Sequence, residues 1–292
     1  MKTIAVIGAG FMGAGIAQVC LQCGYPVFLC DAEKDALQKA RERIAWSLQK
    51  LHQKGWIAQA PETVQQHLTT GLDMGGLSKA AWVIEAVYEN EDLKKSLFCE
   101  IERLAGDETL FATNTSSIPV TRLAATLQQP EKLVGLHFFG PVPFMGLVEV
   151  VRGADTSEKV FVEAVRLVKR LGKHAVCVQK DIPGFVMNRV FAAAFRECQE
   201  LVAEGVATPQ DIDAGMRLGY GWNAGPFEIA DNAGLDTFLR VGQSMKSLGE
   251  EYLYSDSGLV EKLVAEGKLG RKTGEGFYRY DGPGGKRIEE EK

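Results

Sequence analysis

The chain has 292 residues, of which 46% are hydrophobic and 24% charged, with 33 Lys and Arg against 38 Asp and Glu. This composition is ordinary for a water-soluble globular protein with one large or two medium domains. The mild acidity argues against a nucleic-acid partner, because phosphate backbones need clustered Lys and Arg. The chain has no run of about 18 apolar residues and no leader pattern, so we expect a cytoplasmic protein without a membrane segment.

The N-terminal residues combine strand patterns with a glycine-rich turn. Residues 3–8 are a continuous apolar, β-rich run, as in a buried parallel strand. This run leads into a G-x-G-x-x-G sequence at residues 8–13, and a helix pattern follows over residues 13–22. A second strand pattern at residues 26–30 ends at Asp31. In this strand–helix–strand context the glycines predict dinucleotide binding, whereas the six-residue pattern alone would be weak evidence.

The residues of this turn have distinct physical roles. Gly8 permits the tight turn, Gly10 lets the backbone approach a pyrophosphate, and Gly13 lets the helix pack on the strand. The helix N-terminus offers unbonded N–H groups and a partial positive charge to the phosphates. The Asp31 carboxylate suits the ribose hydroxyls of NAD and would repel the 2′-phosphate of NADP, so we expect NAD as cofactor. The expected contacts are Gly8, Gly10, Phe11, Met12, Gly13 and Asp31.

Strand and helix patterns alternate through the rest of the first half. The expected strands cover residues 82–86, 110–113, 134–138, 147–151 and 175–178. The expected helices cover residues 35–54, 61–68, 91–104 and 157–171. This alternation predicts the α/β class with a doubly wound parallel sheet over residues 1–183. From residue 184 the composition changes to helix patterns with glycine breaks, which predicts an all-α C-terminal domain over residues 184–280. The charged, glycine-rich residues 281–292 are expected to be a disordered tail.

Cysteine and histidine spacing predicts no metal site. Cys20 and Cys23 form a single C-x-x-C pair, and a zinc or redox site would need a second pair or a thioredoxin-like context. No histidine is spaced from these cysteines as a metal ligand would be. We therefore expect free thiols and no bound metal.

A nicotinamide-dependent reaction needs a group that exchanges a proton, and four histidines compete for this role. His52, His67 and His174 lie in polar segments and are expected to be solvated. His137 instead ends an apolar strand pattern, where open α/β sheets bind ligands. Glu149 lies inside another apolar segment, and a buried carboxylate there would need a partner such as an imidazole. A His137–Glu149 pair could act as acid and base, but the spacing also allows Glu149 to be exposed on one strand face.

A cluster of small polar residues follows the strand pattern of residues 110–113. These side chains, at residues 113–117, could cap the next helix or hydrogen-bond a substrate oxygen. Both interpretations remain open from the local sequence.

Six segments carry a family resemblance. They are Asn114-Thr-Ser-Ser117, His137-Phe-Phe-x-Pro, Leu147-Val-Glu149-Val, Pro183-Gly-Phe-Val-Met-Asn-Arg189, Gly225-Pro-Phe-Glu and Gly270-Arg-Lys-Thr-Gly-Glu-Gly-Phe-Tyr278. Together they resemble the L-3-hydroxyacyl-CoA dehydrogenase family, in particular its short bacterial 3-hydroxybutyryl-CoA type, over residues 1–280. The resemblance implies a Rossmann-like NAD-binding domain, a helical C-terminal domain that forms a homodimer, and an acyl-CoA substrate.

The resemblance also implies roles for individual residues. The catalytic residues that it implies are His137, Glu149, Ser116 and Asn188. The further cofactor contacts that it implies are Glu89, Lys94 and Lys272. The substrate and CoA contacts that it implies are Ser47, Lys54 and Ser116. The implied reaction is hydride transfer between an (S)-3-hydroxyacyl-CoA and NAD, with the His137–Glu149 pair as acid and base.

Two glycines depart from the family pattern. Gly140 stands where the family usually has Asn, and Gly146 stands where it tends to have Lys. Because both flank the expected catalytic pair, we consider a roomier acyl pocket for a branched or cyclic acyl chain. The alternative is that both glycines are neutral changes in a loop.

Two other functions remain open. One is a dehydrogenase of a free hydroxy acid, similar to gulonate dehydrogenase and lambda-crystallin, which would not need the CoA contacts at Ser47 and Lys54. The other is an NAD-binding protein without turnover, which would not need all four expected catalytic residues.

Overall fold

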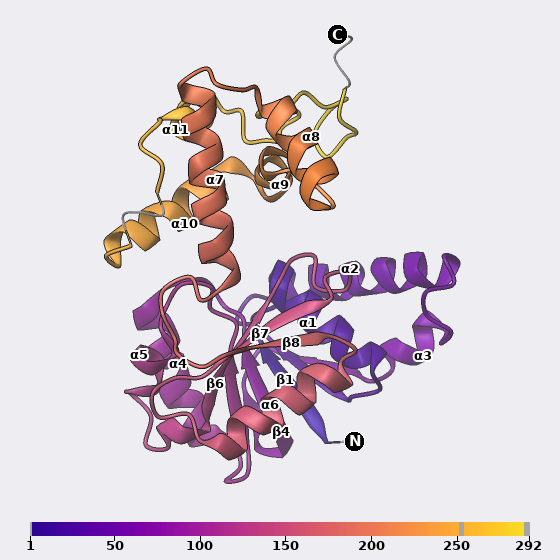
Figure 1. The fold of residues 1–292 in the computed structure, drawn as a ribbon. Coiled ribbons are helices and arrows are strands. Elements are labelled where there is room, and N and C mark those ends of the chain that lie inside the picture. The colour runs from indigo at the N-terminus through magenta and orange to yellow at the C-terminus, as the bar shows by residue number, and fades with distance from the viewer. Residues whose placement is uncertain (1, 251–253, 289–292) are drawn as a thin grey trace. The chain divides into compact units, whose positions relative to one another are not determined.

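The computed structural model describes residues 2–250 and 254–288 (Figure 1). The chain divides into two compact units, Met1–Phe185 and Val186–Lys292, which are described separately below. We predicted the change from α/β to all-α after residue 183, and the units divide after Phe185.

The first unit is built on one eight-stranded sheet with the order β3-β2-β1-β4-β5-β6-β7-β8. The strands are β1 (Thr3–Ile7), β2 (Val27–Cys30), β3 (Leu68–Gly71), β4 (Ala80–Glu85), β5 (Leu110–Thr113), β6 (Leu133–Phe138), β7 (Leu147–Val151) and β8 (His174–Val178). Neighbouring strands are parallel except β6 and β7. The predicted doubly wound sheet is therefore confirmed. Its strand order reverses between β1 and β4, where such sheets bind ligands beyond the carboxyl ends of the strands.

Helices cover both faces of this sheet (Figure 1). One face packs against α1 (Phe11–Gln22), α2 (Lys34–Gln53), α3 (Pro61–Gln65) and α6 (Glu158–Arg170). The other face packs against η1 (Gly75–Lys79), α4 (Glu91–Leu104) and α5 (Val120–Ala124), and η2 (Pro130–Lys132) precedes β6. Along β1, Val6 belongs to the first core cluster and Ala5 to the second, because successive side chains point to opposite faces. Burial on both faces explains the continuous apolar strand patterns.

Two local expectations differ from the structure. The helix expected over residues 61–68 ends at Gln65 as α3, and Leu68–Gly71 forms the edge strand β3 beside β2. Thr69 and Thr70 are β-branched and favour a strand. The β6–β7 pair is antiparallel because only residues 139–146 join its strands. A parallel crossover needs about a dozen residues or more.

The second unit is all-helical, as predicted. Its helices are α7 (Met187–Ala203), α8 (Pro209–Tyr220), α9 (Pro226–Ala233), α10 (Leu235–Ser247) and α11 (Leu259–Ala265). Their shared core includes Phe195 and Phe227, whose rings meet edge to face. The buried carboxylate of Asp231 on α9 accepts hydrogen bonds from the Phe277 and Tyr278 backbone N–H groups. These bonds hold the C-terminal glycine-rich segment against the helices.

We expected disorder from residue 281 onward, whereas residues 281–288 make defined contacts. The Gly284 N–H donates to the Arg271 carbonyl at 2.7 Å, and the Ile288 N–H donates to the Arg279 carbonyl at 2.8 Å. The Arg287 guanidinium lies 3.6 Å from the centre of the Tyr278 ring. Residues 289–292 of the expected tail lie outside the described residues.

Candidate active site

The glycine-rich turn connects β1 to α1 at the reversal of the strand order. Gly8 has a φ angle of 102°, and a Cβ on Gly13 would lie only 1.8 Å from the Gly8 carbonyl oxygen. Both positions therefore require glycine. At Gly10, no described atom lies within 4 Å of the Cβ position, which leaves space for a ligand to approach the backbone. Phe11 and Met12 form the first turn of α1 beside this space.

The groups around this turn suit a dinucleotide. No side chain caps the N-terminus of α1, so its first N–H groups can bind a pyrophosphate. Asp31 directly follows β2, and its carboxylate accepts from the N–H groups of Ala9 at 2.6 Å and Glu33 at 2.9 Å. These bonds fix a negative charge next to the turn, as a ribose contact requires. The structure thus brings together the expected NAD contacts of the turn and Asp31.

His137 and Glu149 lie opposite each other on the antiparallel strands β6 and β7. His137 Nδ1 is 2.7 Å from Glu149 Oε2, and their side chains are 8% and 0% exposed. A carboxylate at this distance accepts the Nδ1 proton, which leaves Nε2 to exchange a proton with a substrate. The open alternative in which Glu149 is exposed is therefore excluded.

Two aromatic rings enclose the imidazole of His137. The Phe139 ring centre lies 4.6 Å from it and the Phe185 ring centre 5.7 Å from it. Phe185 is buried and has a φ angle of 48°, a left-handed conformation that is unfavourable for any residue except glycine. The sequence patterns assigned neither phenylalanine a role, although Phe139 belongs to the His-Phe-Phe motif.

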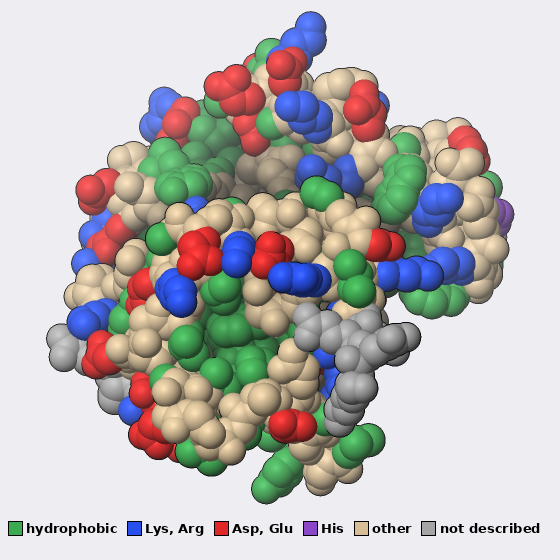
Figure 2. Space-filling model, turned by 90° about the horizontal axis from the view of Figure 1, so that it is seen from above, with side chains coloured by type: hydrophobic (Ala, Val, Ile, Leu, Met, Phe, Trp, Pro, Cys, Tyr) green, Lys and Arg blue, Asp and Glu red, His purple; other side chains and the backbone are tan. Residues whose placement is uncertain are grey.

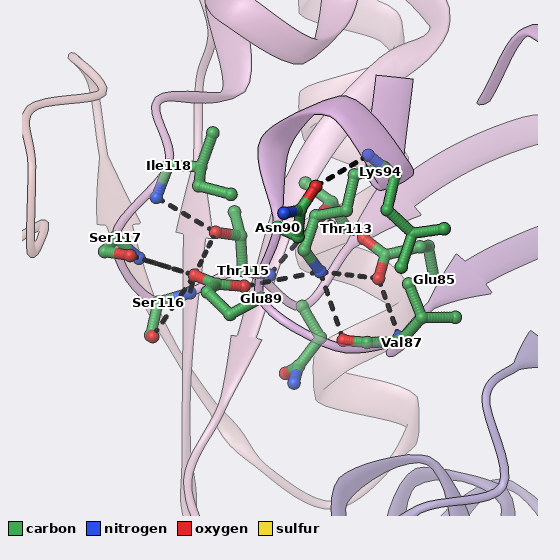
Figure 3. Close-up of polar contacts among 12 residues, drawn as sticks. Glu85, Val87, Glu89, Asn90, Lys94, Thr113, Thr115, Ser116, Ser117 and Ile118 are labelled. Atoms are coloured by element: carbon green, nitrogen blue, oxygen red, sulfur yellow. Dashed lines mark hydrogen bonds and ion pairs between the residues drawn. The ribbon is translucent and has the colours of Figure 1, made fainter. Parts of the chain in front are cut away.

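One carboxylate oxygen of Glu89 organises the polar cluster that follows β5 (Figure 3). Glu89 Oε1 accepts from the Thr115 hydroxyl at 2.6 Å and from the Ser116 N–H at 3.0 Å. It also accepts from the Ser117 N–H at 3.1 Å and the Ser117 hydroxyl at 3.0 Å. Glu89 therefore holds the segment that carries Ser116.

Lys94 is buried between two carboxylates, Glu85 and Glu89 (Figure 3). Its Nζ lies 2.6 Å from Glu85 Oε1 and 3.3 Å from Glu89 Oε2. The second oxygen of Glu85 accepts from the Thr113 hydroxyl at 2.7 Å. This network joins the ends of β4 and β5 to the Ser116 segment. Glu85 was not predicted from the sequence, where its only signal was one acidic residue at the end of an apolar strand.

Asn114 connects the polar cluster to the strand that carries His137. Its side-chain oxygen accepts from the Phe138 N–H at 2.9 Å, and its own N–H donates to the Glu85 carbonyl at 2.8 Å. The helix that follows the cluster, α5, has Pro119 at its N-cap and no side-chain cap. The cluster therefore stabilises the carboxyl edge of the sheet instead of capping the next helix.

The two residues expected to contact CoA lie in different environments. Ser47 is on the buried face of α2, and its hydroxyl accepts from the Gln18 side chain of α1 at 2.9 Å. Lys54 directly follows α2 and is exposed, with its Nζ 5.2 Å from the centre of the Trp56 ring. The structure therefore does not present Ser47 and Lys54 on one open surface.

Asn188 and Lys272 belong to the second unit. Asn188 lies in the first turn of α7, and Lys272 forms an ion pair with Asp236. Their expected contacts with substrate and cofactor stay predictions.

The two glycines that depart from the family pattern lie in the segment after His137. A Cβ on Gly140 would lie 2.9 Å from the Phe11 ring. At Gly146, no described atom lies within 4 Å of the Cβ position. A side chain at position 140 would therefore have to displace Phe11, whereas a side chain at position 146 has room.

Residues 2–250 and 254–288 show neither a metal-binding cluster nor a membrane-spanning helix. No group of three His, Cys, Asp or Glu side chains is arranged there to hold a metal ion. No helix in those residues is both long and apolar enough to cross a membrane.

Known families match both units of the chain. Residues 3–182 match the NAD-binding domain of 3-hydroxyacyl-CoA dehydrogenase, and residues 184–280 match the C-terminal domain of the same enzyme. The chain belongs to the 3-hydroxyacyl-CoA dehydrogenase family. The resemblance inferred from the motifs is thereby confirmed, and NAD-dependent 3-hydroxyacyl-CoA dehydrogenase activity is the function that the family carries.

Individual relatives align over nearly the full length. A probable 3-hydroxybutyryl-CoA dehydrogenase from Deinococcus radiodurans is 42% identical over 276 residues, which cover 94% of this chain and 99% of the relative. The human mitochondrial hydroxyacyl-coenzyme A dehydrogenase is 41% identical, with 96% and 91% covered. The crystal structure of the (S)-3-hydroxybutyryl-CoA dehydrogenase from Ralstonia eutropha has a TM-score of 0.89 at 38% identity, with 96% and 99% covered.

The network around Glu89 predicts a pH-dependent contribution to stability. Burial alone would raise the pKa of the Glu89 carboxyl, but Lys94 and the donors of residues 115–117 lower it below its ordinary value. A lowered native-state pKa stabilises the fold above the unfolded-state pKa of about 4.3, and this stabilisation is lost as the pH falls through the native-state pKa. The Glu89→Gln variant should therefore have a lower free energy of unfolding than wild type at pH 7, with a smaller difference near pH 3.

Urea unfolding followed by circular dichroism between pH 3 and pH 7 measures this difference. Glu100→Gln, at an exposed site on α4, is the matched control and should change little at any pH. If the free energy of unfolding of Glu89→Gln stays below that of wild type by the same amount across the pH range, the prediction is contradicted.

Proposed function

We propose that His137 is the acid–base residue of this dehydrogenase and that Glu149 fixes its tautomer and balances its charge. The observation that carries the proposal is the 2.7 Å contact between His137 Nδ1 and the fully buried carboxylate of Glu149. In the oxidation, His137 Nε2 takes the proton of the C3 hydroxyl of an (S)-3-hydroxyacyl-CoA. NAD, when bound, accepts the hydride from C3, and the product is the 3-oxoacyl-CoA. In the reverse direction His137 returns the proton.

Because the pair is buried, the charge that forms on His137 during the proposed reaction needs Glu149 as a partner. When His137 takes up a proton, an imidazolium forms in surroundings that exclude water, and such a charge is unfavourable without a partner. The carboxylate at 2.7 Å offsets that charge and keeps the ring in one orientation. Both effects support proton transfer at Nε2.

Ser116 is proposed to hydrogen-bond the oxygen at C3. Its segment is held by Glu89, and the reacting atoms of such a complex must lie within about 3–3.5 Å of each other. Asn188 is proposed to contribute a second polar contact to the substrate. These groups would hold C3 in position while His137 exchanges the proton.

The cofactor contacts are proposed to come from Gly8–Gly13, Asp31, Glu89 and Lys272. Lys94 is 1% exposed, so we propose that it acts on the cofactor site through Glu89. For CoA, the exposed Lys54 is the proposed contact, and the buried Ser47 is proposed to hold α2 against α1.

The acid–base role of His137 predicts a selective loss of turnover. His137→Gln should lower kcat by about 10²–10⁴-fold, because general acid–base catalysis contributes that much. NADH binding should change little, because the glycine-rich turn is untouched. NADH absorbance with acetoacetyl-CoA measures turnover, and NADH fluorescence measures binding. His67→Gln, at an exposed site, is the control. Turnover in His137→Gln equal to that in the control would disprove the assignment.

We infer that the substrate carries a short acyl chain. Relatives from Deinococcus radiodurans and Bacillus subtilis are both called probable 3-hydroxybutyryl-CoA dehydrogenases. The roomier pocket considered from Gly140 and Gly146 has less support, because the Phe11 ring occupies the space beside Gly140. Gly146 lines a cavity together with Cys23 and Lys173, and His137 is not among the residues that line it.

A short acyl chain predicts an ordered substrate preference. The kcat/KM for the four-carbon acetoacetyl-CoA should exceed the values for long and ring-bearing 3-oxoacyl-CoAs, because each unfavourable methylene contact in a pocket costs up to about 1–3 kcal/mol. NADH absorbance with the three substrate types measures the order. A maximum on the ring-bearing or long substrate would support the roomier pocket instead.

A cytoplasmic location stays a prediction, because the relatives include bacterial and mitochondrial enzymes.

The second unit is proposed to form a homodimer. Leu218 and Tyr220 on α8 are 89% and 79% exposed, and Val190 and Val206 of the same unit are also exposed. Figure 2 shows hydrophobic side chains gathered between charged ones on one face of the molecule. The proposed homodimer would cover exposed apolar side chains of this kind.

The dimer predicts a mass twice the 31.9 kDa of the chain in sedimentation equilibrium. Leu218→Asp should raise the dissociation constant of the dimer, because a charge would be buried without a partner. Leu72→Asp, at an exposed position of the first unit, is the control. A monomeric wild type, or equal dissociation constants for the two variants, would contradict the proposal.

A further inference from the structure

The segment that joins β6 to β7, residues 139–146, begins directly after the strand of His137 and is called the β6–β7 loop here. Its internal hydrogen bonds form one turn, in which the Phe144 and Met145 N–H groups donate to the Pro141 carbonyl at 3.0 and 3.2 Å. Val142 is buried against α1. A single internal turn does not fix a loop of this length, so contacts from other elements must do so.

Lys173 provides the main polar contact to this loop. Its Nζ donates to the Val142 carbonyl at 2.7 Å and to the Met145 carbonyl at 2.6 Å. The next residue, His174, donates its N–H to the Gly146 carbonyl at 2.7 Å. One side chain of the α6–β8 connection therefore bridges both ends of the turn in the β6–β7 loop.

The ammonium group of Lys173 is buried, which is unfavourable for a positive charge. The residue is 8% exposed, and no acidic side chain in the described part of the chain forms an ion pair with it. Burial lowers the pKa of the Lys173 ammonium, since desolvation disfavours the charge. The two carbonyl groups that accept from Lys173 Nζ offset part of this cost.

We propose that Lys173 is a positioning residue of the dehydrogenase, which fixes the β6–β7 loop and thereby the orientation of His137 and Phe139. The proposal rests on the acid–base role of His137 proposed above. Only one residue pair, Phe138 with Val148, separates the His137–Glu149 pair from the loop. Phe139, whose ring lies 4.6 Å from the imidazole, is the first loop residue.

Loss of the ammonium would leave two carbonyls without their donor. A buried carbonyl without a hydrogen bond is unfavourable, so the loop would rearrange to reach water or another donor. Displacement of a catalytic group by about 1 Å can cost about 10²-fold in rate. Lys173 therefore controls kcat without contacting substrate.

A cavity beside Lys173 allows a decisive test. It has a volume of about 300 Å³ and is lined by Cys23, Met145, Gly146 and Lys173 among others. Apart from its two chain neighbours, no described residue comes within 4 Å of the Cβ position of Gly146, which leaves room there for a small ion. A shortened side chain at position 173 could thus be replaced by a soluble alkylammonium ion.

The experiment measures kcat for Lys173→Ala and Lys173→Met with and without propylammonium. Both variants should lose about 10–100-fold in kcat, with unchanged NADH binding. Propylammonium should restore much of the kcat of Lys173→Ala, because it supplies the missing methylenes and N–H donors. It should not restore Lys173→Met, whose side chain fills the site. Tetramethylammonium, which has no N–H donor, should restore neither variant.

Further variants separate the possible outcomes. Lys169→Ala, at an exposed site on α6, should keep wild-type kcat, and Lys173→Arg should recover part of it because the charge and donors remain. A kcat of Lys173→Ala equal to that of Lys169→Ala would overturn the proposal. A loss in Lys173→Ala that propylammonium does not reverse would also overturn it and indicate a general structural role.

The acid–base proposal fails in a different way. If His137→Gln keeps its turnover, His137 is not the acid–base residue, whatever the amine does to Lys173→Ala. If His137→Gln is inactive and propylammonium fails to restore Lys173→Ala, only the positioning role of Lys173 is lost.

Discussion

The carboxylate of Glu149 is fully buried, and the site depends on the one strand pairing that gives it a partner. In a sheet of otherwise parallel strands, the short β6–β7 connection forces an antiparallel pair and places His137 directly opposite Glu149. A helical crossover at this point would have separated the two residues. The hairpin thus creates the buried His137–Glu149 contact, and its loop begins directly after the strand of His137.

Charged side chains at the same edge of the sheet are paired one after another. Glu85 and Glu89 share Lys94, and Glu89 in turn accepts from the segment that carries Ser116. Since an unpaired buried charge costs several kcal/mol, each partner restricts the position of the next. Figure 3 shows how this chain of contacts runs from the end of β4 to the polar cluster. These contacts therefore link the ends of β4 and β5 to the segment that carries Ser116.

The sequence predicted features that depend on short-range patterns. Apolar strand runs, the glycine turn with Asp31, and His137 at a strand end all follow from residues close together in the chain. The edge strand β3 was missed because four residues with one buried side chain carry little periodicity. The burial of Ser47 against Gln18 and the partners of Glu85 depend on the packing of distant segments. No local pattern contains that information, so only the structure reveals it.

The surroundings of Lys173 likewise could not be predicted from the sequence. In the sequence it is one of many lysines near the end of a helix, where a cation is ordinary. Its burial and its two carbonyl partners appear only when the β6–β7 loop is folded back against the α6–β8 connection. Among the described residues it has no acidic ion-pair partner, and its interior partners are the two carbonyls to which it donates. In this fold those donors bind the backbone of the loop that follows the His137 strand, so a buried cation and the path of that loop depend on each other.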